Sequence, residues 1–345
     1  MIGPMLQRLA IQKPLSPTEV EHVFAVLMGS ETDDAERTAL LVAWNGRVLL
    51  ADESVAMARA MRRRAVPFVV PGRERAVDLC GSGGAPHPSF NISTVSAFVV
   101  AGAGQPVIKH GNRSARGPCG SSDLLEALGL PITSSTSFAR ASFRRYRLAF
   151  LHAPLFHPAT RAVAHARKTL GIPTVFNLLG PLVNPAGVPY QVVGLGDLGI
   201  AERVAEILPK LGVRRGLALS SEEHADEFSP ARRTRGYAWV GPRKRRITVD
   251  PARFLEGDER RGAWGPLEPQ RAADDTERIL AGGGGARRGA ILLTSGAALW
   301  VTGRASSLAA GVDQARTALD SGAAEERLHA LQALANRGEW KREDS

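Results

Sequence analysis

The 345-residue sequence contains few of the residues that define several large classes of proteins. It has only two cysteines, Cys80 and Cys119, which cannot form a disulfide framework or a zinc site. Aromatic residues make up 6%, which argues against a nucleic-acid surface built on base stacking. No apolar run approaches the ~20 residues needed to cross a bilayer, and the first residues do not resemble a secretory signal. These absences predict a cytoplasmic protein with no membrane partner.

Lysine is also scarce, since only six of the 44 basic residues are lysine. The formal net charge is nevertheless +10, and basic residues recur in clusters such as 62–64 and 243–246. A basic protein attracts polyanions, which include both nucleic acids and phosphorylated small molecules. The clusters are dispersed and no basic helix carries interleaved aromatics, so a solvated, arginine-rich surface is the simpler interpretation. Nucleic acid is therefore not the expected partner.

The length fits about two domains, and the contents of hydrophobic (44%) and charged (23%) residues are ordinary for a globular chain. Residues 1–72 are expected to form a small helical domain. Ser16-Pro17-Thr18-Glu19 is a capping box, and apolar residues follow it at helical spacing. Helices around 157–185 are expected to complete this domain.

After Pro71 the pattern changes to short apolar segments that alternate with helical ones. The expected strands lie at 77–80, 106–110, 148–151, 191–194 and 217–219. This alternation predicts an α/β domain over residues 73–345, with a mainly parallel sheet covered by helices. Residues 228–270 are highly charged and show little periodicity, so only short edge strands are expected there.

A glycine-rich loop, Gly81-Ser82-Gly83-Gly84, directly follows the first expected strand. Glycines let the backbone approach a ligand, and free N–H groups favour an anion. Ten residues later, Asn91, Ser93 and Thr94 open a helix whose positive end forms a second candidate phosphate site. The loop is not a Walker A sequence, and Pro86 prevents a match to G-x-G-x-x-G. Each segment alone is consistent with a plain turn or cap, but together they favour a phosphate cradle.

Polar side chains also follow two later strands. Lys109, His110 and Asn112 end the second strand, at the edge where parallel sheets bind ligands. Lys109 suits a pyrophosphate oxygen, and the other two can orient a polar organic substrate. Asp226 and Glu227 follow the strand at 217–219, and paired carboxylates suit Mg²⁺. A structural turn at the first site and a surface acidic pair at the second remain open alternatives.

Arg167 lies in a helix headed by His157-Pro158. An arginine in such a helix is usually a surface charge. Its guanidinium can instead hold a carboxylate through two parallel hydrogen bonds. The sequence alone leaves both interpretations open.

Seven motifs occur in a recognisable order along the chain. They cover residues 81–84, 90–94, 109–113, 120–129, 153–159, 167–171 and 176–185. In these motifs and their spacing, from about residue 16 to residue 330, the sequence resembles the anthranilate phosphoribosyltransferases of tryptophan biosynthesis. The resemblance implies a homodimer formed through the helical domain, with phosphoribosyl pyrophosphate, Mg²⁺ and anthranilate as ligands.

The resemblance also implies roles for individual residues. The implied phosphoribosyl pyrophosphate site consists of Gly81, Ser82, Gly83, Gly84, Asn91, Ser93, Thr94, Lys109 and Arg116. The implied metal ligands are Ser93, Asp226 and Glu227. The implied anthranilate site consists of His110, Asn112 and Arg167, with Pro181 packing near the ring.

Several positions depart from the family pattern, mainly on the phosphoribosyl pyrophosphate side. They are Ala85 and Pro86 in the glycine loop, Arg116 where a serine is usual, and Pro118, Pro173 and Thr294. These departures leave two alternatives open. One is a related enzyme, phosphoribosyltransferase or phosphorylase-like, with another acceptor. The other is a weakly catalytic nucleic-acid-binding protein, although a surface that contacts DNA has no use for the carboxylates of Asp226 and Glu227.

Overall fold

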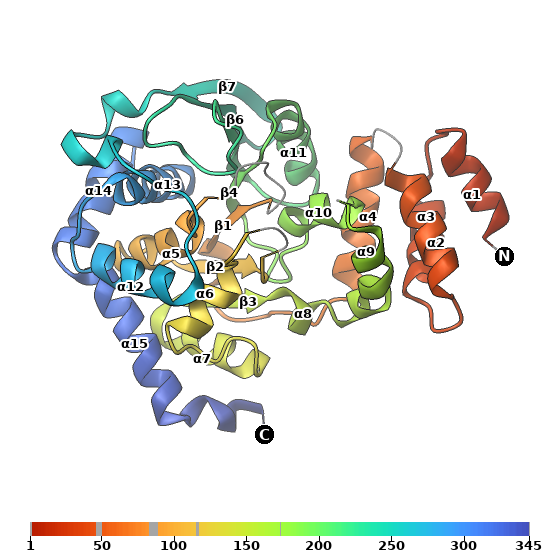
Figure 1. Ribbon diagram of the computed structural model, residues 1–345, viewed down its shortest axis with the longest axis horizontal. Coiled ribbons are helices and arrows are strands. Elements are labelled where there is room, and N and C mark those ends of the chain that lie inside the picture. Colours follow the sequence, from red (N-terminus) through yellow and green to blue (C-terminus); the bar gives the residue numbers. More distant parts are fainter. Residues whose placement is uncertain (1, 46–49, 83–88, 115–116, 173, 345) are drawn as a thin grey trace.

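The computed structural model describes residues 2–45, 50–82, 89–114, 117–172 and 174–344. A small group of helices near the N-terminus lies beside a larger body in which helices surround a sheet (Figure 1). The predicted fold class is therefore confirmed. The exact domain boundary at residue 72 stays a prediction. Within the described residues, no helix is both long and apolar enough to cross a membrane.

One sheet forms the centre of the larger body. Its strands are β1 (Val77–Gly81), β2 (Val107–Gly111), β3 (Leu148–His152), β4 (Tyr190–Gly194), β5 (Arg215–Ser221), β6 (Thr234–Val240) and β7 (Arg243–Val249). They lie in the order β3-β2-β1-β4-β5-β6-β7, with the first five parallel and the last two antiparallel. The register pairs Gly81 with Gly194 and Gly111 with His152. These strands therefore end at the same edge, which gathers the polar residues that follow them.

Helices account for most of the remaining chain. The N-terminal helices are α1 (Gly3–Ala10), α2 (Pro17–Met28), α3 (Asp34–Asn45) and α4 (Ala51–Arg63). Those that follow β1 in the chain are α5 (Ile92–Gly102), α6 (Ser121–Ala127), α7 (Thr136–Tyr146), α8 (Ala153–Phe156), α9 (Ala164–Leu170) and α10 (Val175–Leu179). The later ones are α11 (Leu198–Lys210), α12 (Pro269–Leu280), α13 (Ala286–Thr302), α14 (Leu308–Asp320) and α15 (Ala323–Arg337).

The described residues also form six short 3₁₀ segments. They are η1 (Arg73–Arg75), η2 (Pro158–Val163), η3 (Gly180–Leu182), η4 (Pro251–Arg253), η5 (Gly257–Arg260) and η6 (Glu339–Asp344). Segment η3 places Pro181 in the connection between α10 and β4.

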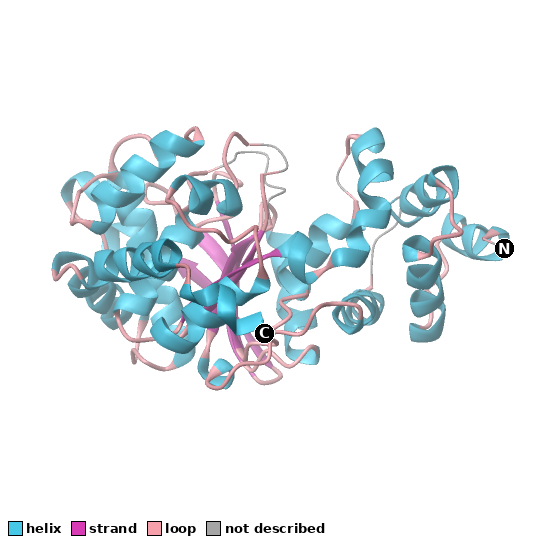
Figure 2. Cartoon of the chain, turned by 90° about the horizontal axis from the view of Figure 1, so that it is seen from below, coloured by secondary structure: helices cyan, strands magenta, loops and turns pink. Residues whose placement is uncertain are grey.

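Helices cover both faces of the sheet (Figure 2). Successive strand residues point to opposite faces, so neighbours in β1 enter different hydrophobic clusters. Leu79 packs in the cluster that contains the apolar residues of α5 and α13. Cys80 packs in the cluster that contains the N-terminal helices and α11. Burial on both faces explains why the parallel strands appear in the sequence as short, continuous apolar runs.

The N-terminal helices pack against a later part of the chain. The expected capping box opens α2, where Ser16 and Glu19 exchange hydrogen bonds. Phe24 of α2 meets Trp44 edge-to-face at 5.7 Å between ring centroids and lies 5.9 Å from Phe176 of α10. Helices α9 and α10 accordingly lie beside α3 and α4 (Figure 1). Residues far apart in sequence thus form the helical wall next to the sheet.

A partly buried arginine ties this wall to the larger body. Arg62 of α4 donates through Nε to the carbonyl of Leu182 and through Nη1 to the carbonyl of Leu211, both at 3.0 Å. Leu182 belongs to η3, next to Pro181. The helical part therefore fixes a segment that the sequence assigned to the anthranilate site.

Several elements were not anticipated from the sequence. No pattern pointed to α1, α7, α12 or α15. The expected edge strands are two full seven-residue strands, β6 and β7. Strand β7 forms despite its run of cations because Lys244 pairs with Glu202 and Glu206 and lies over the ring of Tyr237. Its stability depends on contacts that do not appear in a local pattern.

We expect Gly311→Ala to lower the free energy of unfolding by about 1–3 kcal/mol, because α14 touches α13 there. A Cβ at Gly311 would overlap the carbonyl oxygen of Gly296, so the helices would have to separate. Chemical denaturation measures the change. Gly3→Ala is the matched control, because its new Cβ meets no atom within 4 Å. Equal stability of the two variants would contradict this close packing.

Candidate active site

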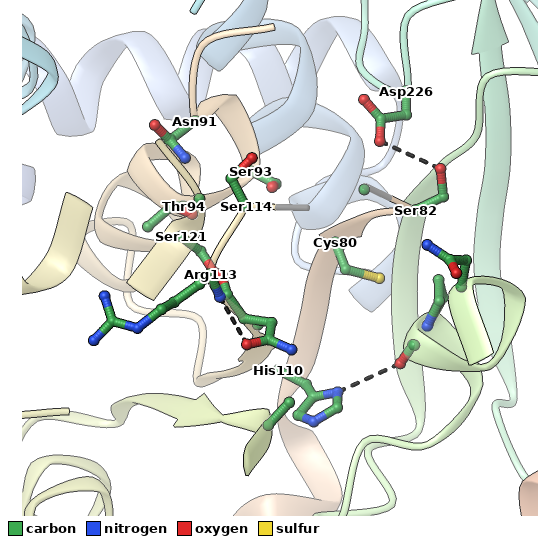
Figure 3. Close-up of a pocket in the computed structure, with 18 of the residues that line it drawn as sticks. Cys80, Ser82, Asn91, Ser93, Thr94, His110, Arg113, Ser114, Ser121 and Asp226 are labelled. Atoms are coloured by element: carbon green, nitrogen blue, oxygen red, sulfur yellow. Dashed lines mark hydrogen bonds between the residues drawn. The ribbon is translucent and has the colours of Figure 1, made fainter. Parts of the chain in front are cut away.

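A pocket of about 300 Å³ lies at the edge where β1 and β2 end (Figure 3). Every sequence-predicted site residue that the structure describes lines it. They are Gly81, Ser82, Asn91, Ser93, Thr94, Lys109, His110, Asn112, Arg167, Pro181, Asp226 and Glu227. The other predicted residues, Gly83, Gly84 and Arg116, lie outside the described part of the chain, as do Ala85, Pro86 and Pro173. The fold thus joins segments separated by up to 146 positions.

The start of α5 and the end of β2 form one wall of the pocket. Lys109 is 3% exposed, and its Nζ donates to the carbonyl of Leu79 at 2.6 Å and to Ser93 Oγ at 3.2 Å. The Ser93 hydroxyl and the first N–H groups of α5 therefore lie next to a buried ammonium group. Asn91 precedes the helix and donates through Nδ2 to the carbonyl of Cys119 at 3.2 Å. This wall combines a positive charge with a helix N-terminus, which is the chemistry that binds phosphate.

Asp226 and Glu227, in the loop after β5, also line the pocket, and both are 7% exposed. Ser82 donates to Asp226 Oδ2 at 3.3 Å, and the Ser93 N–H donates to Glu227 Oε1 at 3.2 Å. The acidic loop lies so close to β4 that a Cβ at Gly194 would overlap the Asp226 carbonyl oxygen. Only glycine permits this approach.

Burial and the neighbouring Asp226 carboxylate raise the pKa of Glu227 to about 8, against the opposing effect of Lys109. The groups around Asp226 and Glu227 therefore do not fully compensate the negative charge that the two carboxylates carry when both are ionised. Ser93, Asp226 and Glu227 offer hydroxyl and carboxylate oxygens, which are the donors that Mg²⁺ prefers. The residues present fit a divalent cation.

Two histidines lie together deeper in the pocket. The rings of His110 and His157 are 5.1 Å apart and nearly perpendicular. His110 Nδ1 lies 3.4 Å from the carbonyl oxygen of Gly180, and its Nε2 is buried with no hydrogen-bond partner among the described residues. Burial lowers the pKa of His110 to about 3 and that of His157 to about 4. Both rings are therefore neutral at physiological pH.

Arg167 lines the pocket rather than the surface. Its guanidinium lies 5.3 Å from the ring centroid of Phe176, and its Nη2 lies 3.5 Å from Asn177 Oδ1. Burial lowers its pKa from the ordinary value. The Arg167 guanidinium is stacked on an aromatic ring and makes one long hydrogen bond, so its other N–H groups are well suited to bind a carboxylate.

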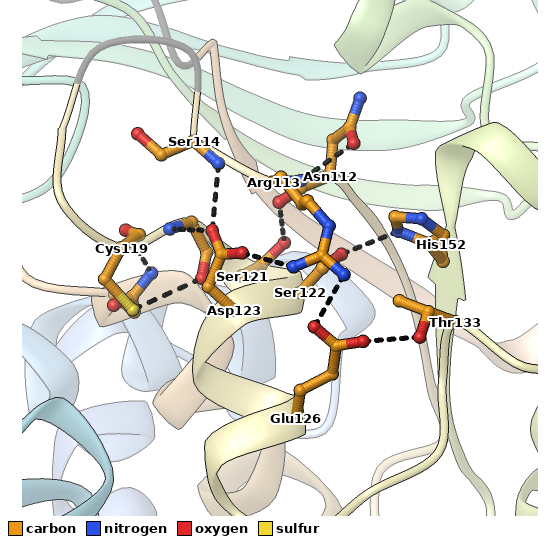
Figure 4. Close-up of polar contacts among 12 residues, drawn as sticks. Asn112, Arg113, Ser114, Cys119, Ser121, Ser122, Asp123, Glu126, Thr133 and His152 are labelled. Atoms are coloured by element: carbon orange, nitrogen blue, oxygen red, sulfur yellow. Dashed lines mark hydrogen bonds and ion pairs between the residues drawn. The ribbon is translucent and has the colours of Figure 1, made fainter. Parts of the chain in front are cut away.

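A polar network holds the turn that carries Asn112 (Figure 4). Asp123 of α6 accepts from the backbone N–H groups of Ser114 at 3.2 Å and Gly120 at 2.8 Å. Its other oxygen accepts from Arg113 Nη1 at 2.6 Å, and Arg113 also pairs with Glu126. The carboxylate therefore joins the two ends of the segment that follows β2.

Sequence reasoning did not assign several residues that line the pocket, including Met61, Cys119, His157, Thr160 and Phe176. Met61 follows helical spacing, which predicts a core residue. Phe176 and His157 lie in motifs that carry the family resemblance, and His157-Pro158 also begins a predicted helix, but neither pattern assigns a site role. Among the departures from the family pattern, Pro118 is not part of the pocket lining, and Thr294 is buried in α13.

Comparisons with known proteins give a class for this fold and site. Residues 4–65 match the helical bundle domain of the glycosyl transferase family, and residues 73–325 match its a/b domain. The helical part and the α/β body, whose residues together line the pocket, thus place the chain in this glycosyl transferase family.

Similarity to individual proteins is more specific, and it shows that the chain belongs to the anthranilate phosphoribosyltransferase family. It is 37% identical to that of Desulfosudis oleivorans, with 96% of this chain and 98% of the relative covered. It is 38% identical to that of Syntrophobacter fumaroxidans, with 97% and 99% covered. The crystal structure of the Thermus thermophilus protein superposes with a TM-score of 0.87 at 35% identity, covering 96% and 99%. The resemblance inferred from the motifs is therefore confirmed.

The protein from Saccharomyces cerevisiae gives a more distant comparison. Its structure in complex with PRPP and Mg has a TM-score of 0.84, covering 97% of this chain and 98% of the yeast chain. Its sequence identity is 23%, so the likeness shows the shared fold alone.

We expect the buried, neutral His157 to make stability pH-dependent. An unfolded histidine binds a proton near pH 6.5, whereas the folded pKa is about 4, so stability is lost as pH falls between these values. The change from pH 6.5 to 4.5 amounts to about 2 kcal/mol. His157→Gln should remove this part of the fall, as measured by urea denaturation at several pH values. The same fall in the variant would show that the pKa of His157 is not lowered in the folded protein.

Proposed function

We propose that this protein transfers the phosphoribosyl group of phosphoribosyl pyrophosphate to the amine of anthranilate and releases pyrophosphate. One observation carries the proposal. A single pocket joins a phosphate-binding wall around Lys109 to a region with neutral histidines and Arg167. The two halves match the two substrates in charge, because one is polyanionic and the other is an aromatic acid.

Phosphoribosyl pyrophosphate would bind along the ends of β1 and β2 and the start of α5. Lys109 would meet pyrophosphate oxygens as a point charge, and Ser82, Asn91, Ser93 and Thr94 would supply hydroxyl and amide groups. When bound through Ser93, Asp226 and Glu227, Mg²⁺ would neutralise negative charge on the pyrophosphate. The raised pKa of Glu227 supports this assignment, because a cation would relieve the repulsion from Asp226.

Anthranilate would enter beside the helical wall. Arg167 would hold its carboxylate, and Asn112 would orient it from the end of β2. Pro181 would pack near the ring, and the buried Nε2 of His110, which has no partner among the described residues, would face the substrate. Neutral histidines suit this role because a neutral ring can donate or accept a hydrogen bond, while Arg167 supplies the positive charge for the carboxylate.

The reaction breaks the bond between ribose C1 and a pyrophosphate oxygen and forms a bond from C1 to the amine nitrogen. Positive charge develops on the sugar while negative charge develops on the leaving group. Lys109, fixed by two hydrogen bonds in a buried site, would stabilise that leaving group without reorganisation. The aromatic amine is already nucleophilic, so positioning the two substrates would account for much of the rate.

Two further parts of the proposal concern assembly and location. A homodimer formed through the helical domain and a cytoplasmic location stay predictions. Ile11 and Val42, which are 57% and 48% exposed, give the helical part apolar surface that a second copy could cover.

The decisive test is loss of anthranilate fluorescence in the presence of protein, phosphoribosyl pyrophosphate and Mg²⁺. We expect loss only when all three are present. If fluorescence persists while phosphoribosyl pyrophosphate still binds by calorimetry, the acceptor is a different compound. If neither substrate binds, the catalytic proposal is wrong, and salt-dependent binding of nucleic acid is the next experiment.

We expect Arg167→Ala to raise the KM for anthranilate about 10- to 100-fold, since a charged hydrogen bond contributes about 1.5–3 kcal/mol. The KM for phosphoribosyl pyrophosphate should change little. Arg161→Ala is the matched control, because Arg161 is exposed in η2, close in sequence, and does not line the pocket. Equal increases in both KM values would contradict the assigned role of Arg167.

A further inference from the structure

A carboxylate buried beneath the pocket has no part in the mechanism described above. Asp78, in the middle of β1, is 0% exposed and is not among the residues that line the pocket. Its Oδ1 accepts from the backbone N–H of His110 at 3.1 Å, and its Oδ2 accepts from Asn184 Nδ2 at 2.9 Å. The side chain therefore bridges two segments that approach it from different parts of the chain.

Asn184 extends this bridge to a third point. Besides Asp78, its Nδ2 donates to the carbonyl of Ile108 at 3.0 Å, and its Oδ1 accepts from the N–H of Ala186 at 2.9 Å. The side chain is 3% exposed and uses both of its polar atoms. Asp78 and Asn184 together connect β1, β2 and the loop between η3 and β4.

The connected segments carry both sides of the proposed anthranilate site. His110 and Asn112 lie at the end of β2, and Pro181 lies in η3, three residues before Asn184. Gln191 of β4 also holds η3, because its Nε2 donates to the Pro181 carbonyl at 2.7 Å. The separation between the two sides thus depends on buried side chains that the substrate does not contact.

Stability alone is a poor explanation for this arrangement. Removing a carboxylate from water is costly, and replacing a buried ion with a well-packed apolar residue often leaves stability unchanged or higher. Position 78 lies on the face of β1 opposite to Val77 and Leu79, and both Asp78 oxygens accept hydrogen bonds there. Both oxygens of this carboxylate accept hydrogen bonds from segments of the site, which indicates that Asp78 positions those segments.

We propose that Asp78 is a positioning residue that, through Asn184, fixes the distance between the turn at 110–112 and the segment at 181–184. It thereby sets the shape of the anthranilate half of the pocket. This inference rests on the proposed function, since it assigns these segments to the acceptor.

Asp78→Asn is the primary test, because it keeps the size and one hydrogen bond. The new carboxamide can still accept from the His110 N–H, but its NH₂ group then faces the NH₂ group of Asn184. We expect the KM for anthranilate to rise at least tenfold, with less than a threefold change in the KM for phosphoribosyl pyrophosphate. Initial rates of anthranilate fluorescence loss give both values.

Gln105→Leu is the matched control. Gln105 is also buried, and its Nε2 donates to the carbonyl of Arg75 at 2.6 Å, so it joins the same two strands at their opposite ends. We expect it to lower the melting temperature without changing either KM. The double variant Asp78→Asn/Asn184→Asp restores a donor opposite an acceptor, and we expect it to recover part of the affinity for anthranilate.

Several results would overturn the inference. One is that Asp78→Asn lowers stability and leaves both KM values unchanged, as Gln105→Leu does. Another is that Asp78→Asn raises both KM values equally. If Asp78→Asn does not fold, Asn184→Ser decides, because its shorter side chain breaks the same bridge and should produce the same selective change. A wild-type protein without transferase activity would refute the proposed function and this inference with it. Wild-type activity with an unselective Asp78→Asn variant would refute the inference alone.

Discussion

The buried ammonium of Lys109 is the charge on which the pocket depends. It is almost inaccessible to water, and it is held by the Leu79 carbonyl and the Ser93 hydroxyl. Its charge lowers the pKa of Asp78 and of Glu227, which burial otherwise raises. One cation thus partly compensates acidic groups on both sides of β1 and β2, although the pKa of Glu227 still lies far above its usual range. The remaining negative charge gives the site its fit to a divalent cation.

The second requirement is that three distant segments meet at one sheet edge. Parallel strands in register end together, so β1, β2 and β4 present their following residues side by side. The acidic loop after β5 closes over this edge only because Gly194 leaves room for it. The helical wall then adds Arg167 and His157, and Arg62 anchors it to η3. The pocket is consequently shared by both parts of the chain.

The arginine-rich character of the chain has a largely local explanation. Arg288 is 5% exposed and pairs with Glu259 and Asp320, and Arg64 pairs with Glu21. Arg245 lies over the ring of Trp300. Such cations support packing between elements.

The sequence by itself determined the local structure and the chemistry available to the site. The positions of the five parallel strands, the capping box at Ser16 and the motifs around Lys109 all depend on neighbouring residues, so they could be predicted. Only the tertiary structure decided which groups meet. The strand β7, the buried pair of His110 and His157, and the bridge from Asp78 to Asn184 depend on contacts between residues far apart in the chain. Asp78 looked like one more residue of an apolar strand, because burial and hydrogen-bond partners are properties of the packed molecule and not of a sequence segment.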